Sequence, residues 1–380
     1  MSGIGRSGDE QKNLAKLPET ASYGFIPGLN GLRALSVLIV IIAHMGLEHI
    51  VPGGFGVTMF FFISGFLITR LLLAESEAKA KAGETLDLGK FYLRRLIRLY
   101  PALLFMLGIT TGLYIILGYG APAPMELAAG IGYFTNIYQV IARIAGELPF
   151  MPWTHLWSLA VEEHFYLAFP LLVILFRKNW RGLALALGAI MSLSVLWRAY
   201  IIFCTNLPVQ DYNYMMTDAR IDSLAWGCFL AVILHINGSV TRLKNFIGFI
   251  PTFLAFVGLG LSFVLRDEIF RYTLRFSVQG GAIFTLMFNL YYWRGFSFAF
   301  IILDWKPLAW IGSISYALYL WHVPVFDLFT RGFGESLIVR LIAVICSFFL
   351  AAFSFYYVEK PFLALRRKFG SHAGGITPMP

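Results

Sequence analysis

Ten apolar windows, each long enough to cross a bilayer, constrain the fold of this 380-residue chain more than any other feature. A hydrocarbon core of about 30 Å needs about 20 apolar residues in a helix. The windows begin near residues 29, 56, 99, 156, 182, 218, 247, 272, 310 and 336. Because 58% of the residues are hydrophobic and only 13% are charged, a soluble globular domain is excluded. We therefore predict an all-α polytopic membrane protein with about ten transmembrane helices.

A further apolar stretch, residues 125–143, contains Glu126, Asn136, Gln139 and Arg143 and is harder to place. If it spans the membrane, the basic turn at residues 177–181 lies outside, against the positive-inside rule. We expect it to be re-entrant or interfacial instead. Ten spans then put both termini in the cytoplasm, and the same rule explains the net charge of +9 without nucleic acid.

The chain divides into one membrane domain and two short tails. We expect a cytoplasmic N-terminal tail over residues 1–28, the membrane domain over 29–364 and a cytoplasmic C-terminal tail over 365–380. The first tail is polar and has no apolar core followed by a cleavage site, so we expect no cleaved signal peptide. The three cysteines lack metal-like spacing, and we expect neither a disulfide framework nor a metal site.

Arg33 and His44 are two ionisable residues in the first predicted helix, where placing them inside a bilayer costs free energy. Eleven residues advance a helix by about three turns plus roughly 20°, so the two side chains share a face and lie about 16 Å apart along the axis. Ionisable groups inside a bilayer usually mark a substrate path or a reacting centre. Arg33 alone could snorkel to the headgroups, and His44 alone could bond a neighbouring helix. The alignment of both residues on one face favours a functional role over these two structural ones.

Three arginines, Arg94, Arg95 and Arg98, cover one side of a turn before the third window. Such a turn anchors to anionic lipid, or it clamps the phosphates of a cytoplasmic cofactor, because guanidinium forks match phosphate oxygens. The spacing alone favours lipid anchoring.

A third feature of this kind is a carboxylate pair, Glu162 and Glu163, in the helix that begins near residue 156. A carboxylate bonded to an imidazole orients it and raises its basicity, so one of them could prepare His44 to act as a general base. Alternatively, one faces water and the other pairs with an arginine such as Arg220. Adjacent helical residues point about 100° apart, so at most one faces a common site.

Two later segments carry polar residues inside apolar surroundings. Arg220 and Asp222 form either a structural ion network or part of an acceptor mouth, and the sequence leaves both open. Tyr316 and His322 belong to a stripe at helical spacing that is more typical of packing than of catalysis. Glu359, before Lys360 and Pro361, indicates a helix end.

Taken together, these motifs resemble the acyltransferase 3 family, the bacterial integral-membrane O-acyltransferases that modify cell-surface glycans. The matching pieces occur in family order over residues 31–44, 56–66, 91–101, 157–166, 220–227, 314–322 and 358–361. The resemblance implies about ten helices and acyl transfer from cytoplasmic acetyl-CoA to an outer hydroxyl. It makes Arg33 and His44 the catalytic signature and ties Arg94 and Arg95 to donor binding.

This chain departs from the family pattern at two positions. It has Thr58 where members commonly have an acidic residue or proline, and His164 where they have glutamine. The first departure weakens any role for a carboxylate in that loop, and the second adds an imidazole of unknown role. Members often carry an additional SGNH hydrolase-like domain. Since this sequence has none, we expect the membrane domain to act alone or with a partner.

The combined expectation is an O-acetyltransferase of the bacterial inner membrane that acts on a polysaccharide, O-antigen or exopolysaccharide. The expected catalytic residues are His44, Arg33 and Glu162, and the expected donor-binding residues are Arg94, Arg95, Arg98 and Arg33. The expected acceptor-binding residues are Glu163, Arg220, Asp222, Tyr316 and His322. His44 acts as a base or carries the acetyl group itself, and the spacing leaves both open.

Acetyl-CoA, the glycan and membrane lipid are the expected partners, without metal or nucleic acid, and homo-oligomerisation is left open. The alternatives are a transporter or flippase for a lipid-linked or acylated glycan, and an acyltransferase with another donor such as succinyl-CoA. A dicarboxylic donor would need an additional cationic group near His44.

Overall fold

The computed structural model describes residues 26–150, 152–236 and 239–366, and within these ranges it is helical without a β-strand. The predicted tails, residues 1–28 and 365–380, lie mostly outside the described residues. The longer helices are α2 (Leu29–Ile42), α3 (Gly53–Lys81), α4 (Leu88–Ile116), α7 (Trp157–Leu175), α8 (Trp180–Cys204), α10 (Thr217–His235), α12 (Phe249–Val264), α14 (Arg275–Tyr292), α17 (Ser315–Phe333) and α18 (Leu337–Phe353). The shorter ones are α5 (Pro124–Ile131), α6 (Thr135–Ile144), α9 (Val209–Met215), α11 (Ser239–Arg242), α13 (Glu268–Tyr272), α15 (Ala299–Leu303), α16 (Lys306–Ser313) and α19 (Lys360–Arg366).

Six segments of the described chain are long and apolar enough to cross a membrane. They are Leu29–Leu47, Gly53–Lys81, Leu88–Ile116, Thr154–Leu175, Trp180–Cys204 and Leu337–Leu365. The sequence predicted ten spans, and the other four fall on α10, α12, α14 and α17. These helices are shorter or more polar: α12 has 16 residues, and α10 carries Asp218, Arg220 and Asp222.

The ambiguous stretch over residues 125–143 forms the two short helices α5 and α6. The chain breaks between them at Tyr133, whose φ of 54° lies in the left-handed region. Helices of 8 and 10 residues are about 12 and 15 Å long, well below the thickness of a bilayer core. The segment therefore does not cross the membrane as one helix.

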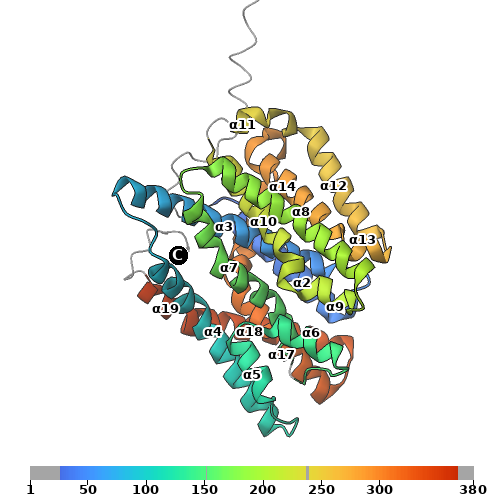
Figure 1. The fold of residues 1–380 in the computed structure, drawn as a ribbon. Coiled ribbons are helices and arrows are strands. Elements are labelled where there is room, and N and C mark those ends of the chain that lie inside the picture. Colours follow the sequence, from blue (N-terminus) through green and yellow to red (C-terminus); the bar gives the residue numbers. More distant parts are fainter. Residues whose placement is uncertain (1–25, 151, 237–238, 367–380) are drawn as a thin grey trace, which may run out of the picture.

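Helix α3 lies at the centre of the bundle and packs against α2, α7, α10 and α14. Figure 1 shows α8, α10, α12 and α14 on one side and α4, α17 and α18 on the other, with α7 between the two groups. Two glycines allow α3 and α10 to cross closely. A Cβ at Gly65 would overlap the carbonyl oxygen of Leu224, and one at Gly227 would overlap that of Phe62.

Two of the helices continue into π-helical turns. Helix α2 passes into a turn over Ala43–Leu47 (η2), which contains His44 and is kinked at Gly46, whose φ is 87°. Helix α18 passes into Ser354–Glu359 (η6), which ends on a buried carboxylate. Such turns are rare and frequently occur at functional sites.

The connection before α4 ends in an N-cap that fixes where this helix begins. Asp87 accepts a hydrogen bond of 2.9 Å from the backbone N–H of Lys90. That bond lowers the pKa of the Asp87 carboxyl, so the cap is charged at neutral pH. The arginine turn of α4 begins two helical turns further on.

Candidate active site

A cavity of about 910 Å³, including its open mouth, runs beside α3 and is lined by α2, α4, α7 and α17. Its apolar wall follows α3 from Val57 to Leu71, which is about 21 Å at 1.5 Å per residue. Its polar wall consists of Arg33, Arg95, Arg98, Ser158, Glu162, Tyr166, Ser315, Tyr316 and Tyr319. A long ligand with a charged end and an apolar arm fits such a lining.

The three arginines of α4 point in different directions around the helix axis. Arg95 and Arg98, three residues apart, both line the cavity, whereas Arg94 is buried and pairs with Glu75 at 2.7 Å. Neighbouring helical positions point about 100° apart, so Arg94 and Arg95 cannot face one site. The structure therefore places Arg94 outside this cavity, and its predicted contact with the donor stays a prediction.

Two guanidinium groups of the cavity, those of Arg33 and Arg98, have no ion pair within the described residues. Arg95 differs, because it pairs with Glu163 at 2.6 Å and lies 3.5 Å from the ring centre of Tyr166. Arg33 and Arg98 remain free to bind an anion, which Arg forks do bidentately when the anion is a phosphate.

The two adjacent glutamates of α7 face different groups. Glu162 lines the cavity beside Ser64 and within electrostatic range of Arg33 and Arg95. Glu163 is held by Arg95, so its predicted contact with an acceptor is not found. The described residues show no hydrogen bond between Glu162 and His44, whose Nδ1 lies instead at the carbonyl of Val40, so the predicted orienting contact is not formed in this structure.

His44 lies outside the cavity, in the π turn, and its side chain is exposed. Its Nδ1 lies 2.9 Å from the carbonyl oxygen of Val40. The group beside its ring is an imidazole rather than a carboxylate, because the ring centroid of His322 is 5.1 Å away. His155 follows at 5.2 Å from His322.

Tyr319 connects this group of histidines to the cavity. It lines the cavity, its hydroxyl lies 2.6 Å from Ser158 Oγ, and its ring centroid is 5.3 Å from His155 and 5.4 Å from His322. Tyr316 also lines the cavity, and its hydroxyl donates to the carbonyl of Leu99 at 3.0 Å. The predicted stripe on α17 therefore faces the cavity and the histidines.

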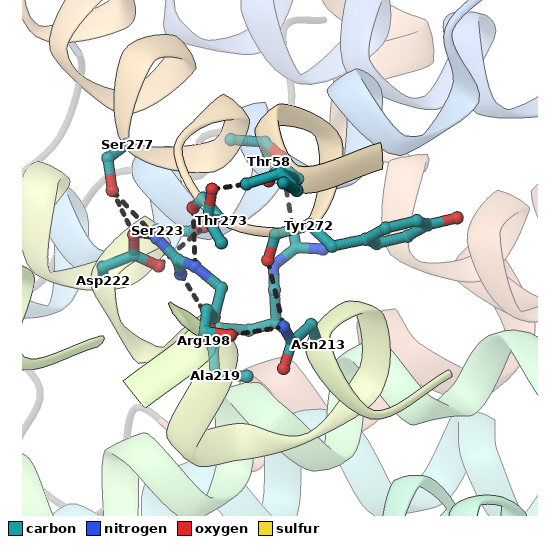
Figure 2. A network of polar contacts seen from close by, with 11 residues as sticks. Thr58, Arg198, Asn213, Ala219, Asp222, Ser223, Tyr272, Thr273 and Ser277 are labelled. Carbon is teal, nitrogen blue, oxygen red and sulfur yellow. Dashed lines mark hydrogen bonds and ion pairs between the residues drawn. The ribbon is translucent and has the colours of Figure 1, made fainter. Parts of the chain in front are cut away.

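Asp222 belongs to a buried structural network, drawn in Figure 2. Arg198 donates to Asp222 at 2.8 Å, to the carbonyls of Thr273 and Ala219 and to Ser277 Oγ. Both partners of the ion pair are fully buried. The network ties α8, α10 and α14 together. Of the two roles that the sequence left open for Asp222, the structure therefore shows the ion network and not an open acceptor site.

Arg220 is likewise fully buried, in an aromatic cage. Its guanidinium lies 3.8 Å from the ring centre of Phe276 and donates to Tyr214 O and Thr58 Oγ1. It therefore does not form an acceptor mouth either. Thr58, one of the two positions where this chain departs from the family pattern, accepts a hydrogen bond from this guanidinium. The other departure, His164, bonds Thr217 Oγ1 at 2.7 Å.

The sequence reasoning missed Arg198 and Glu359. Arg198 lies within an apolar helix, which is itself a signal of a buried partner. Glu359 was interpreted only as a helix end, yet it is buried, its Oε1 has no hydrogen-bond partner in the described chain, and it acts electrostatically on Arg33 and Arg98. A carboxylate at the end of an otherwise apolar helix is the signal that could have found it.

Comparison with known proteins gives matches along almost the whole chain. A family model described as "Acyltransferase domain", of the acyltransferase 3 type, matches residues 26–357. The O-acetyltransferase OatA of Staphylococcus aureus is 31% identical over 400 residues, which cover 97% of this chain and 62% of the relative. The peptidoglycan O-acetyltransferase OatA of Listeria monocytogenes is 30% identical over 362 residues, 90% of this chain and 56% of the relative. The chain thus spans less than two thirds of these relatives. No solved structure matches.

Proposed function

Because the chain belongs to the acyltransferase 3 family, we propose that it is a membrane O-acetyltransferase that moves an acetyl group from acetyl-CoA to a hydroxyl of a cell-wall glycan. The names of the relatives support peptidoglycan as the acceptor class, ahead of O-antigen and exopolysaccharide. The observation that carries the proposal is the cavity, whose two unpaired guanidinium groups and apolar wall fit the two ends of coenzyme A.

The donor binds with its phosphates on Arg33 and Arg98. Arg95 stiffens this end of the cavity, because Glu163 and Tyr166 hold its guanidinium on two sides. The pantetheine arm follows the apolar wall of α3. The thioester extends past Ser158 and Tyr319 toward His44, on the side where the cavity meets the histidines.

His44 performs the transfer at its Nε2 atom. The carbonyl of Val40 can only accept a hydrogen bond, so Nδ1 carries the hydrogen and Nε2 keeps its lone pair in the neutral ring. That lone pair removes the proton of the acceptor hydroxyl as the hydroxyl attacks the thioester, and the thiolate of coenzyme A leaves. Because the side chain is exposed, a glycan can reach it.

An acetyl donor fits better than a dicarboxylic one. Succinyl-CoA would need a free cation near His44. Within the described residues, the cation that contacts the π turn is Arg340, which already binds the carbonyl of Met45 at 2.7 Å and the carboxylate of Glu335 at 3.2 Å.

We further propose that donor and acceptor approach from opposite sides of the bacterial inner (plasma) membrane. Arg33 at the start of α2, Arg98 in the first half of α4 and Glu359 after α18 interact electrostatically at one end of the bundle. We assign this end to the cytoplasm, with ten spans and both termini inside, in agreement with the positive-inside rule.

The test is coenzyme A release by the full chain in lipid nanodiscs. With acetyl-CoA and soluble peptidoglycan fragments, thiol release should depend on the fragments and should match the acetyl ester formed on them, measured by mass spectrometry. If thiol release does not respond to the fragments and no ester forms, the proposed acetyltransferase activity is contradicted, and a transporter becomes the better explanation.

A further inference from the structure

Glu162 is the one carboxylate among the described residues that line the donor cavity. It lies on α7 one helical turn from Ser158, at the histidine end of the cavity, and one turn from Tyr166, at the arginine end. Four residues advance a helix by about 6 Å, so Glu162 is midway along this wall. The cavity therefore has an acidic group in its middle, between the places proposed for the phosphates and for the thioester.

Ser64 lies at the same depth on α3. It is the one polar side chain among the described residues of α3 that line the cavity, halfway between Val57 and Leu71 and about 10 Å from each at 1.5 Å per residue. Its hydroxyl is the hydrogen-bonding partner of Glu162. A hydroxyl and a carboxylate therefore interrupt an otherwise apolar part of the cavity.

The carboxylate of Glu162 is incompletely paired. It forms no ion pair within the described residues, because Arg95 pairs with Glu163 at 2.6 Å and Arg33 acts on Glu162 only electrostatically. An ionised carboxylate accepts about four hydrogen bonds, and the hydroxyl of Ser64 supplies one donor. Acceptor sites without a donor are costly at membrane depth, so a ligand with N–H or O–H groups is stabilised at this position.

The pantetheine arm of coenzyme A has such groups in its middle. Between the phosphates and the sulfur it contains two amides and a hydroxyl, and an amide N–H needs an acceptor when it leaves water. The wall of α3 offers only Ser64, since the backbone of a helix is bonded to itself. The guanidinium groups of the cavity can only donate. Glu162 is therefore the acceptor that matches the amides of the arm.

We infer that Glu162 and Ser64 form a binding site for the middle of the pantetheine arm, where the Glu162 carboxylate accepts a hydrogen bond from an amide N–H and the Ser64 hydroxyl donates to an amide carbonyl. The N–H of the ligand replaces the Ser64 hydroxyl at Glu162, which frees that hydroxyl to donate. The inference rests on the proposed function. It gives Glu162 a role in donor binding in place of the predicted contact with His44. Holding the arm at its middle fixes how far the thioester extends past Ser158 and Tyr319.

The experiment measures binding of coenzyme A and of adenosine 3′,5′-bisphosphate to the full chain in nanodiscs by isothermal titration calorimetry. The bisphosphate has phosphates like those of coenzyme A and lacks the pantetheine arm. Glu162→Ala should weaken coenzyme A binding about tenfold or more, as expected for the loss of a hydrogen bond to a charged acceptor. Binding of the bisphosphate should stay the same or become tighter, because the variant removes a negative charge near Arg33.

Glu77→Ala is the control for the loss of a carboxylate, because Glu77 is half exposed and pairs with His235 outside the cavity. This variant should bind both ligands as the wild type does. Glu162→Gln keeps an acceptor oxygen and should lose less affinity for coenzyme A than Glu162→Ala. A purely electrostatic or structural role of Glu162 would instead change the binding of both ligands in the same direction.

Two results would overturn the site: unchanged or tighter binding of coenzyme A to Glu162→Ala, or an equal weakening of both ligands. If Glu162→Ala does not fold, the wild type is titrated with coenzyme A analogues in which one amide N–H at a time is replaced by an ester oxygen. The site predicts a loss of about tenfold for one analogue, and equal affinity for all of them refutes it. If the wild type binds no coenzyme A, the proposed function fails, whereas coenzyme A binding that does not respond to Glu162 removes only this site.

Discussion

The imidazole rings of His44 and His322 lie 5.1 Å apart, centroid to centroid, at an interplanar angle of 63°. This edge contact joins the exposed π turn after α2 to the buried middle of α17. It places a second imidazole beside His44, while Glu162 stays in the cavity near Arg33 and Arg95. The π turn and the cavity therefore contain different ionisable groups, imidazoles at the first and a carboxylate with guanidinium groups in the second.

Arg98→Gln should raise the KM for acetyl-CoA about tenfold or more with a smaller effect on kcat. The guanidinium lines the cavity, and a hydrogen bond to a charged group contributes about 1.5–3 kcal/mol. Initial rates at varied acetyl-CoA measure it. Arg94→Gln is the matched control, because Arg94 pairs with Glu75 instead. An equal rise in KM in both variants would show that the assignment of the two arginines is wrong.

Arg340→Ala should lower kcat and leave the KM for acetyl-CoA unchanged. Its Nη1 donates to the carbonyl of Met45 in the π turn at 2.7 Å. Without this bond, His44 loses its position relative to His322. The same kinetic assay separates the two parameters, and Glu335→Gln, which alters only an exposed pairing partner, serves as the control. Unchanged kcat in Arg340→Ala would contradict this role.

Arg198→Ala should destabilise the protein by about 3–5 kcal/mol, because it leaves the buried carboxylate of Asp222 without its cation. Thermal unfolding in detergent, followed by the fluorescence of the tryptophans, measures the loss. The folded fraction should still bind acetyl-CoA normally, since the network does not line the cavity. Weakened donor binding without a loss of stability would argue against a structural network.

Periodicity and composition were sufficient to predict an all-helical membrane protein. They also indicated that only one of Glu162 and Glu163 would face a common site, and the structure shows Glu162 in the cavity. Which of two adjacent residues faces a cavity depends on the rotation of the helix, and packing against other helices sets that rotation. For this reason the sequence could not separate Arg94 from Arg95.

Contacts between distant segments were beyond the reach of the sequence pattern. Asp222 pairs with Arg198 on another helix, and Glu359 approaches Arg33 across almost the whole length of the chain. The sequence analysis also did not predict the π turn, because it assumed a regular helix over the eleven residues from Arg33 to His44. The turn exposes His44 and brings its ring to His322.

The most direct test of the account is acetyl ester formation on peptidoglycan fragments by the His44→Ala variant in nanodiscs, measured by mass spectrometry beside the wild type. We predict acetyl ester on the fragments with the wild type and only background with the variant. Because His44→Ala leaves the residues of the cavity unchanged, the variant should still bind labelled acetyl-CoA. Wild-type amounts of ester from His44→Ala would contradict the central claim that acetyl transfer takes place at this imidazole.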